Sequence, residues 1–209
     1  MTAGRPRELM IDRAIHVVAL AGALAGAAIL SASPTDAGQR LGIGLYVAGL
    51  FAMLACSTLH NWPLATAGKG VLRRLDHAAI FLMIAGTYSP FMIALAGDDA
   101  VLAVFAFVWG TAAAGIVLKL ARPACLERLS VALYLAIGWS GVLVFDRAVE
   151  RLPAHVVCLI GVGGILYTLG AVFHVWRRLP YQNAIWHGFV VAAAFTHYLA
   201  VAALLDLGA

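Results

Sequence analysis

The stretch VLAVFAFVWGTAAAGIVLKL, residues 101–120, contains a single charged side chain, Lys119, near its end. A helix of about 20 residues crosses the ~30 Å apolar core of a lipid bilayer. Inside that core every backbone polar group has to find its partner within the protein, which a helix achieves on its own. This stretch therefore predicts a transmembrane helix.

Six further stretches of the same kind flank it, and the whole chain is apolar. Of its 209 residues 63% are hydrophobic and 11% are charged, whereas soluble domains carry about 25% charged residues. The predicted helices cover residues 14–30, 41–60, 76–96, 101–120, 130–145, 155–175 and 184–205. We therefore expect an all-α integral membrane protein, a single seven-transmembrane-helix bundle over residues 1–209, multi-pass in the plasma (inner) membrane.

The basic residues orient this bundle. Eleven of the 14 Lys and Arg residues fall on one side of the predicted helices: Arg5, Arg7, Arg13, Lys69, Arg73, Arg74, Lys119, Arg122, Arg128, Arg177 and Arg178. The other side has Arg40, Arg147 and Arg151. Basic loops stay in the cytoplasm, so we expect the N-terminus inside and the C-terminus outside. Because the charges are spread over short loops, the net charge of +4 does not indicate a nucleic-acid partner.

Polar side chains gather at the predicted cytoplasmic ends of three helices. An ionisable group inside a membrane costs ~2.5–3.5 kcal/mol and usually faces the bundle interior. The second helix ends with Ser57, His60 and Asn61, the third begins with Asp76, and the seventh begins with Asn183 and His187. Residues four apart share a helix face, which pairs Ser57 with Asn61 and Asn183 with His187. We therefore expect Ser57, Asn61, Asp76, Asn183 and His187 to form one cluster.

Other polar positions have simpler interpretations. Asp76 at the start of a helix is also explained as a capping residue that interacts with the helix dipole, and this alternative stays open. His16, His155 and His174 are expected at the membrane interface, while His60 and His77 neighbour a loop and also suit the lipid headgroup region.

Several motifs resemble those of a known family. LRRLDHAAIF at residues 72–81 and IAGTYSPF at residues 84–91 are similar to the third-helix signature of the hemolysin III group, part of the progestin and adipoQ receptor (PAQR) family. GGILYTLG at residues 163–170 and NAIWH at residues 183–187 resemble its sixth-helix and seventh-helix signatures. The resemblance covers nearly the whole chain and implies seven helices with the N-terminus inside.

The resemblance also implies a zinc site, from which this sequence departs. Better-studied members hold zinc with one histidine from a Ser-x-x-x-His motif and two from a His-x-x-x-His motif, and an aspartate orients the metal-bound water. Here Ser57 and Asp76 match the catalytic positions and His187 matches one ligand, but Asn61 and Asn183 occupy the other two ligand positions. Asparagine is a poor substitute for imidazole on zinc, although His60 is a candidate replacement. Zinc is therefore expected to be weak or absent.

Three functions follow from these observations. The first is membrane lipid sensing or homeostasis, with membrane lipids as partners and the cluster as a hydrogen-bonded network around a degenerate zinc site. The second is a zinc-dependent membrane lipid amidase resembling the alkaline ceramidases, with Asp76 as general base. The third is a pore-forming cytolysin or channel, which the family name suggests, but the sequence shows neither a ring-forming charged segment nor an amphipathic toxin helix.

Overall fold

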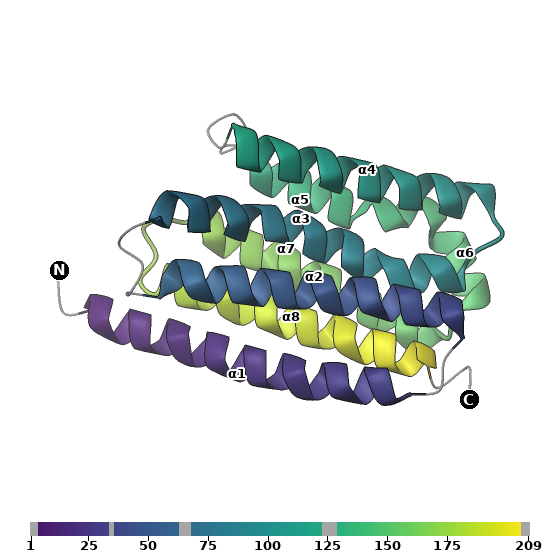
Figure 1. The fold of residues 1–209 in the computed structure, drawn as a ribbon, viewed down its shortest axis with the longest axis horizontal. Helices are drawn as coiled ribbons and strands as arrows, with labels where there is room; N and C mark the ends of the chain where they lie inside the picture. Colours follow the sequence, from purple (N-terminus) through teal and green to yellow (C-terminus); the bar gives the residue numbers. More distant parts are fainter. Residues whose placement is uncertain (1–3, 34–35, 63–67, 123–128, 206–209) are drawn as a thin grey trace.

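The computed structural model describes residues 4–33, 36–62, 68–122 and 129–205, and its regular secondary structure in these ranges is entirely helical. The helices are α1 (Gly4–Ala32), α2 (Ala37–Asn61), α3 (Lys69–Ala94), α4 (Asp99–Ala121), α5 (Ser130–Gly138), the 3-10 helix η1 (Ser140–Val144), α6 (Phe145–Arg151), α7 (Ala154–Val175) and α8 (Gln182–Leu205). They make seven apolar spans long enough to cross a membrane, the fifth formed by α5, η1 and α6 together. Figure 1 shows the spans side by side. The predicted seven-span helical bundle is confirmed.

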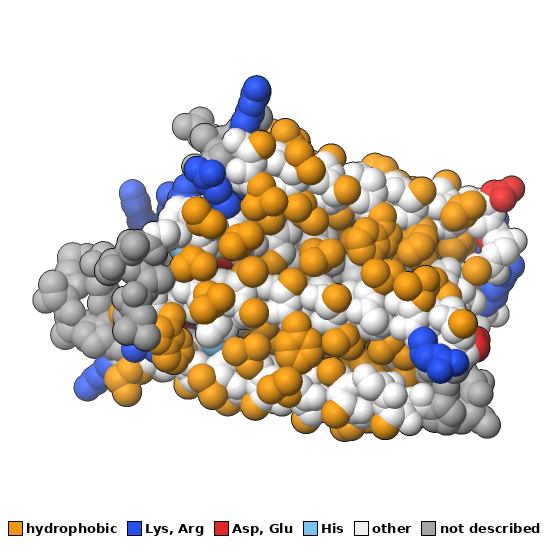
Figure 2. Space-filling model, viewed as in Figure 1, with side chains coloured by type: hydrophobic (Ala, Val, Ile, Leu, Met, Phe, Trp, Pro, Cys, Tyr) orange, Lys and Arg blue, Asp and Glu red, His pale blue; other side chains and the backbone are white. Residues whose placement is uncertain are grey.

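The outer surface of the bundle is apolar along its length. On the face shown in Figure 2, hydrophobic side chains cover the middle, while charged side chains lie towards the two ends. Large apolar residues such as Val18 and Leu143 expose 68% and 73% of their surface. Such a continuous apolar surface suits contact with lipid rather than water. The orientation, with the N-terminus in the cytoplasm, stays a prediction. We call the end at which α1, α3 and α8 begin the N-terminal end of the bundle.

Two glycines let α2 and α3 pack closely. A Cβ atom added at Gly86 lies 2.6 Å from the carbonyl oxygen of Leu45, and one added at Gly49 lies 2.9 Å from that of Leu82. Any larger residue therefore forces the two backbones apart. Small residues at helix crossings are the usual means of close packing in membranes, where van der Waals contact drives association. This contact fixes the end of α2 beside the start of α3.

Helix α1 lies on the edge of the bundle, against α2 and α8 (Figure 1). Helix α8 packs in turn along α7, where a Cβ atom at Gly170 lies 2.9 Å from Cβ of Phe189. As a result, the first turns of α1 lie next to the end of α2 and the beginning of α8.

The fifth span differs from the uninterrupted helix predicted over residues 130–145. Helix α5 ends at Gly138, a 3-10 turn follows, and α6 continues the span to Arg151. The Tyr88 hydroxyl donates to the Gly138 carbonyl at 2.7 Å and accepts from the Gly141 N–H at 2.8 Å. A side chain from α3 thus satisfies backbone groups that the break releases, as membrane depth requires.

The C-terminal end of the fifth span is held by an ion pair. Nε of Arg147 donates to the Asp98 carboxylate at 3.1 Å, just before α4. This hydrogen bond, together with those from the backbone N–H groups of Ala100 and Val101, lowers the pKa of Asp98. The span therefore extends past residue 145 to Arg151, and its charged end has a partner just before α4.

Candidate functional site

Three of the five side chains that were predicted to cluster line one cavity near the N-terminal end of the bundle. Ser57 comes from the last turns of α2, Asp76 from α3 and His187 from the start of α8. Helix α3 begins at Lys69, so Asp76 lies about two turns inside the helix and is not its capping residue. The N-cap is Gly68, which has a positive φ of 88° and no side-chain cap.

The two asparagines are directed elsewhere. The Asn61 amide donates to the Ser57 carbonyl of its own helix at 2.9 Å, and Asn183 is exposed in the first turn of α8. Neither residue lines the cavity. Asn61 and Asn183, at the positions where the family resemblance implies two zinc histidines, therefore do not join His187 in lining the cavity, and with their amides so placed they do not fit a zinc ion.

Helix α1 supplies two residues that the sequence analysis missed. Asp12 and His16 expose only 3% and 4% of their surface. His16 reaches the Ser57 hydroxyl with Nε2 at 3.1 Å, and Asp12 reaches Nδ1 of His187 with its carboxylate at 2.5 Å. The rings of His16 and His187 meet edge to face with centroids 4.6 Å apart. His16 is thus buried within the bundle and not at the interface where it was expected.

Asp76 lies within electrostatic range of the same group. Its carboxylate interacts electrostatically with His60, His187 and His16, and it accepts a hydrogen bond from the Ser57 hydroxyl. His60 is half-buried, and its Nδ1 atom has no hydrogen-bond partner among the described residues. We call this group the polar cluster; it consists of Asp12, His16, Ser57, His60, Asp76 and His187.

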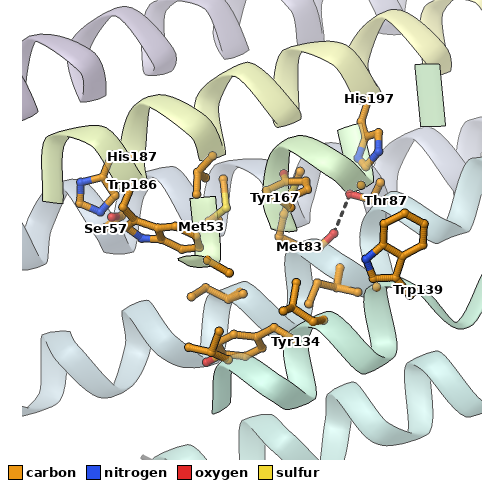
Figure 3. Close-up of a pocket in the computed structure, with 18 of the residues that line it drawn as sticks. Met53, Ser57, Met83, Thr87, Tyr134, Trp139, Tyr167, Trp186, His187 and His197 are labelled. Carbon is orange, nitrogen blue, oxygen red and sulfur yellow. Dashed lines mark hydrogen bonds between the residues drawn. The ribbon is translucent and has the colours of Figure 1, made fainter. Parts of the chain in front are cut away.

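The cavity extends from the polar cluster into the apolar middle of the bundle. Its volume is about 140 Å³. Figure 3 shows Ser57, Trp186 and His187 at one end and Tyr167, Trp139 and His197 towards the other. Methionine and aromatic side chains line the stretch between them, with residues from α2, α3, α5, α7 and α8. The cavity is therefore polar at one end and mainly apolar along the rest.

Two buried polar atoms at the inner end of the cavity lack partners among the described residues. They are the Tyr167 hydroxyl and Nδ1 of His197. Nε2 of His197 is bonded to the Ile160 carbonyl at 3.1 Å, and the Thr87 hydroxyl donates to Met83 at 2.8 Å (Figure 3). Because nearly all buried polar groups are hydrogen-bonded in native proteins, the free atoms suit a polar group brought in by a ligand or by water.

Comparison with known proteins identifies the family. The family described as Haemolysin-III related matches residues 9–198 of the chain. The chain belongs to this family. It is 29% identical to the "Hemolysin-3 homolog" of Bacillus subtilis (strain 168) over 91% of the chain and 90% of that protein. It is 32% identical to "Hemolysin-3" of Bacillus cereus over 82% of the chain and 76% of that protein.

A more distant relative extends the similarity to the PAQR family. The "Heptahelical transmembrane protein ADIPOR2" of Oryza sativa subsp. japonica is 30% identical over 65% of the chain and 69% of that protein. The hemolysin III group recognised from the sequence motifs is thereby confirmed. With its seven apolar spans and bacterial relatives, the chain is a multi-pass protein of the plasma membrane. That Asn61 and Asn183 replace zinc histidines stays a prediction.

Proposed function

We propose that this protein binds one membrane lipid in its internal cavity and acts in membrane lipid sensing or homeostasis. The observation that carries the proposal is the gradient along the cavity, from Ser57, Asp76 and His187 at one end to apolar and aromatic side chains beyond them. An amphiphile matches such a gradient, because its chain buries apolar surface while its headgroup forms hydrogen bonds. Pockets with a few polar groups in an apolar lining are the usual form of ligand site.

The placement of the cavity between helices explains how binding is sensed. Ser57 and Asp76 belong to the closely packed α2 and α3, whereas Tyr134 and Trp139 belong to the broken fifth span. A lipid that contacts the α2–α3 pair and the fifth span at once stabilises the conformation in which these two parts of the bundle lie close to it. A ligand shifts a conformational equilibrium only by its difference in affinity for the two states, and these contacts provide that difference.

A cavity-filling variant tests the proposal. Gly164 lines the cavity, and a Cβ atom there makes only ordinary contacts, 3.5 Å from the Trp139 ring. Gly164→Leu should therefore extend into the cavity beside the Trp139 ring. Its control is Gly161→Leu on the same helix, where an added Cβ meets nothing within 4 Å. Lipids that remain after detergent exchange are extracted and measured by mass spectrometry.

The unchanged protein and Gly161→Leu should retain one lipid class, and Gly164→Leu should lose most of it. Equal retention in all three proteins would contradict the proposal. The same preparations test the amidase alternative, which is favoured by the carboxylate of Asp76 near the imidazoles of His60 and His187. Hydrolysis of an N-acyl lipid that disappears in Asp76→Asn would make the amidase the better description.

A further inference from the structure

The geometry points to a metal site whose ligands come mainly from the first helix: we propose that Asp12, His16 and His187 bind a divalent transition metal ion such as zinc. Only His187 coincides with a position implied by the family resemblance. The other two ligands lie on α1, which contributes none of the zinc histidines of the better-studied members. The proposal does not depend on lipid binding.

The donor atoms are close enough to share one ion. One ligand atom from each of the three residues lies within 4.8 Å of the others, and the Asp12 carboxylate is 2.5 Å from Nδ1 of His187. Zinc binds nitrogen and oxygen at about 2.0–2.1 Å, so tetrahedral donors are ~3.3 Å apart. The one spacing given lies below this value, and the 4.8 Å limit on the others lies above it. Two imidazoles and one carboxylate also match known zinc and iron ligand sets.

Hydrogen bonding holds His16 in the tautomer that a metal ligand needs. Its Nδ1 atom is 2.8 Å from the Asp12 carbonyl oxygen, and because a carbonyl only accepts, Nδ1 must carry the proton. The neutral ring then has its lone pair on Nε2, the atom that meets the Ser57 hydroxyl. Metal-bound histidines are usually held in this way, with the second ring nitrogen donating to a carbonyl or carboxylate.

Charge balance favours a cation at this place. Asp12 is almost fully buried, and Asp76 interacts electrostatically with His60 as well as with His16 and His187. Two carboxylates in the membrane interior are costly unless positive charge accompanies them. A divalent ion supplies that charge while both imidazoles stay neutral. The competing arrangement is an ion pair between Asp12 and a protonated His187 with no metal.

Metal content of the full-length protein separates the two arrangements. The protein is purified in detergent, loaded separately with Zn²⁺, Fe²⁺, Mn²⁺ or Co²⁺, passed through metal-free buffer and assayed by mass spectrometry for bound metal. The variants are Asp12→Asn and His16→Gln. The matched controls are Asp99→Asn and His155→Gln, which alter the same residue types at exposed positions at the other end of the bundle.

About one ion per chain is expected in the unchanged protein and in both controls. Loss of even a supporting partner lowers metal affinity about 10–100-fold, so loss of a ligand should lower it at least tenfold. The Co²⁺ form should show visible bands of a nitrogen and oxygen site, absent from Asp12→Asn. Metal that is unaffected by both α1 variants would overturn the proposal.

Thermal unfolding distinguishes a variant that has lost metal binding from one that only folds poorly. A ligand that binds the folded state alone raises the unfolding temperature, so the added ion should stabilise the unchanged protein and neither α1 variant. Suppose instead that the unchanged protein binds no ion and that Asp12→Asn lowers the unfolding temperature equally with and without metal. The metal-free ion pair would then be correct and the proposal wrong.

Discussion

The hydroxyl groups of Tyr134 and Tyr167 differ, although both side chains line the cavity. The Tyr134 hydroxyl donates to the His77 carbonyl at 2.8 Å, whereas the Tyr167 hydroxyl has no partner among the described residues. Tyr134→Phe should therefore lower the free energy of unfolding by about 0.5–1.5 kcal/mol, while Tyr167→Phe should leave it unchanged or raise it. Thermal unfolding of lipid-free protein in detergent measures both. Equal losses would show that the Tyr167 hydroxyl has a partner.

Single residues also show what the sequence predicts about the site. Ser57, Asp76 and His187 were correctly brought together because helix direction alone fixes their depth in the membrane. Asp12 and His16 were missed because depth does not reveal that α1 lies beside both α2 and α8. A signal was present: an aspartate and a histidine four residues apart share a helix face, and both fall in the first apolar span.

At the scale of helices, the contact between α2 and α3 can be tested with two glycines. Alanine at Gly86 places its Cβ 2.6 Å from the Leu45 carbonyl, whereas alanine at the exposed Gly44 meets nothing within 4 Å. Gly86→Ala should destabilise the protein by about 1–3 kcal/mol through overpacking. Gly44→Ala should be neutral or stabilising by up to ~1 kcal/mol, because alanine favours helix.

Thermal unfolding in detergent measures the difference between these variants. If Gly86→Ala is as stable as Gly44→Ala, the two backbones do not touch at this crossing.

Apolar length predicted the spans well, since seven stretches of sufficient length became seven spans. It did not predict the break after Gly138, because the apolar run continues through the 3-10 turn and hydropathy contains no information on the hydrogen bond from Tyr88.

At the scale of the whole molecule, cysteine labelling tests the orientation in the membrane. Ala96 and Arg178 are exposed at opposite ends of the bundle. In a variant lacking Cys56, Cys125 and Cys158, a cysteine at position 96 should react with an impermeant maleimide in intact cells. A cysteine at position 178 should react only after the membrane is opened, because the basic residues keep its loop in the cytoplasm. The reverse labelling pattern would contradict the predicted topology.

The contact between Asp12 and His187 has a consequence for biosynthesis. It joins α1 to α8 across 175 residues of chain. At 5–20 residues per second, the ribosome needs about 9–35 s to make the intervening chain. During that time α1 holds an aspartate in the membrane without the histidine that will face it. This contact therefore cannot close until α8 has been made, and a chain truncated before α8 leaves the Asp12 carboxylate without His187.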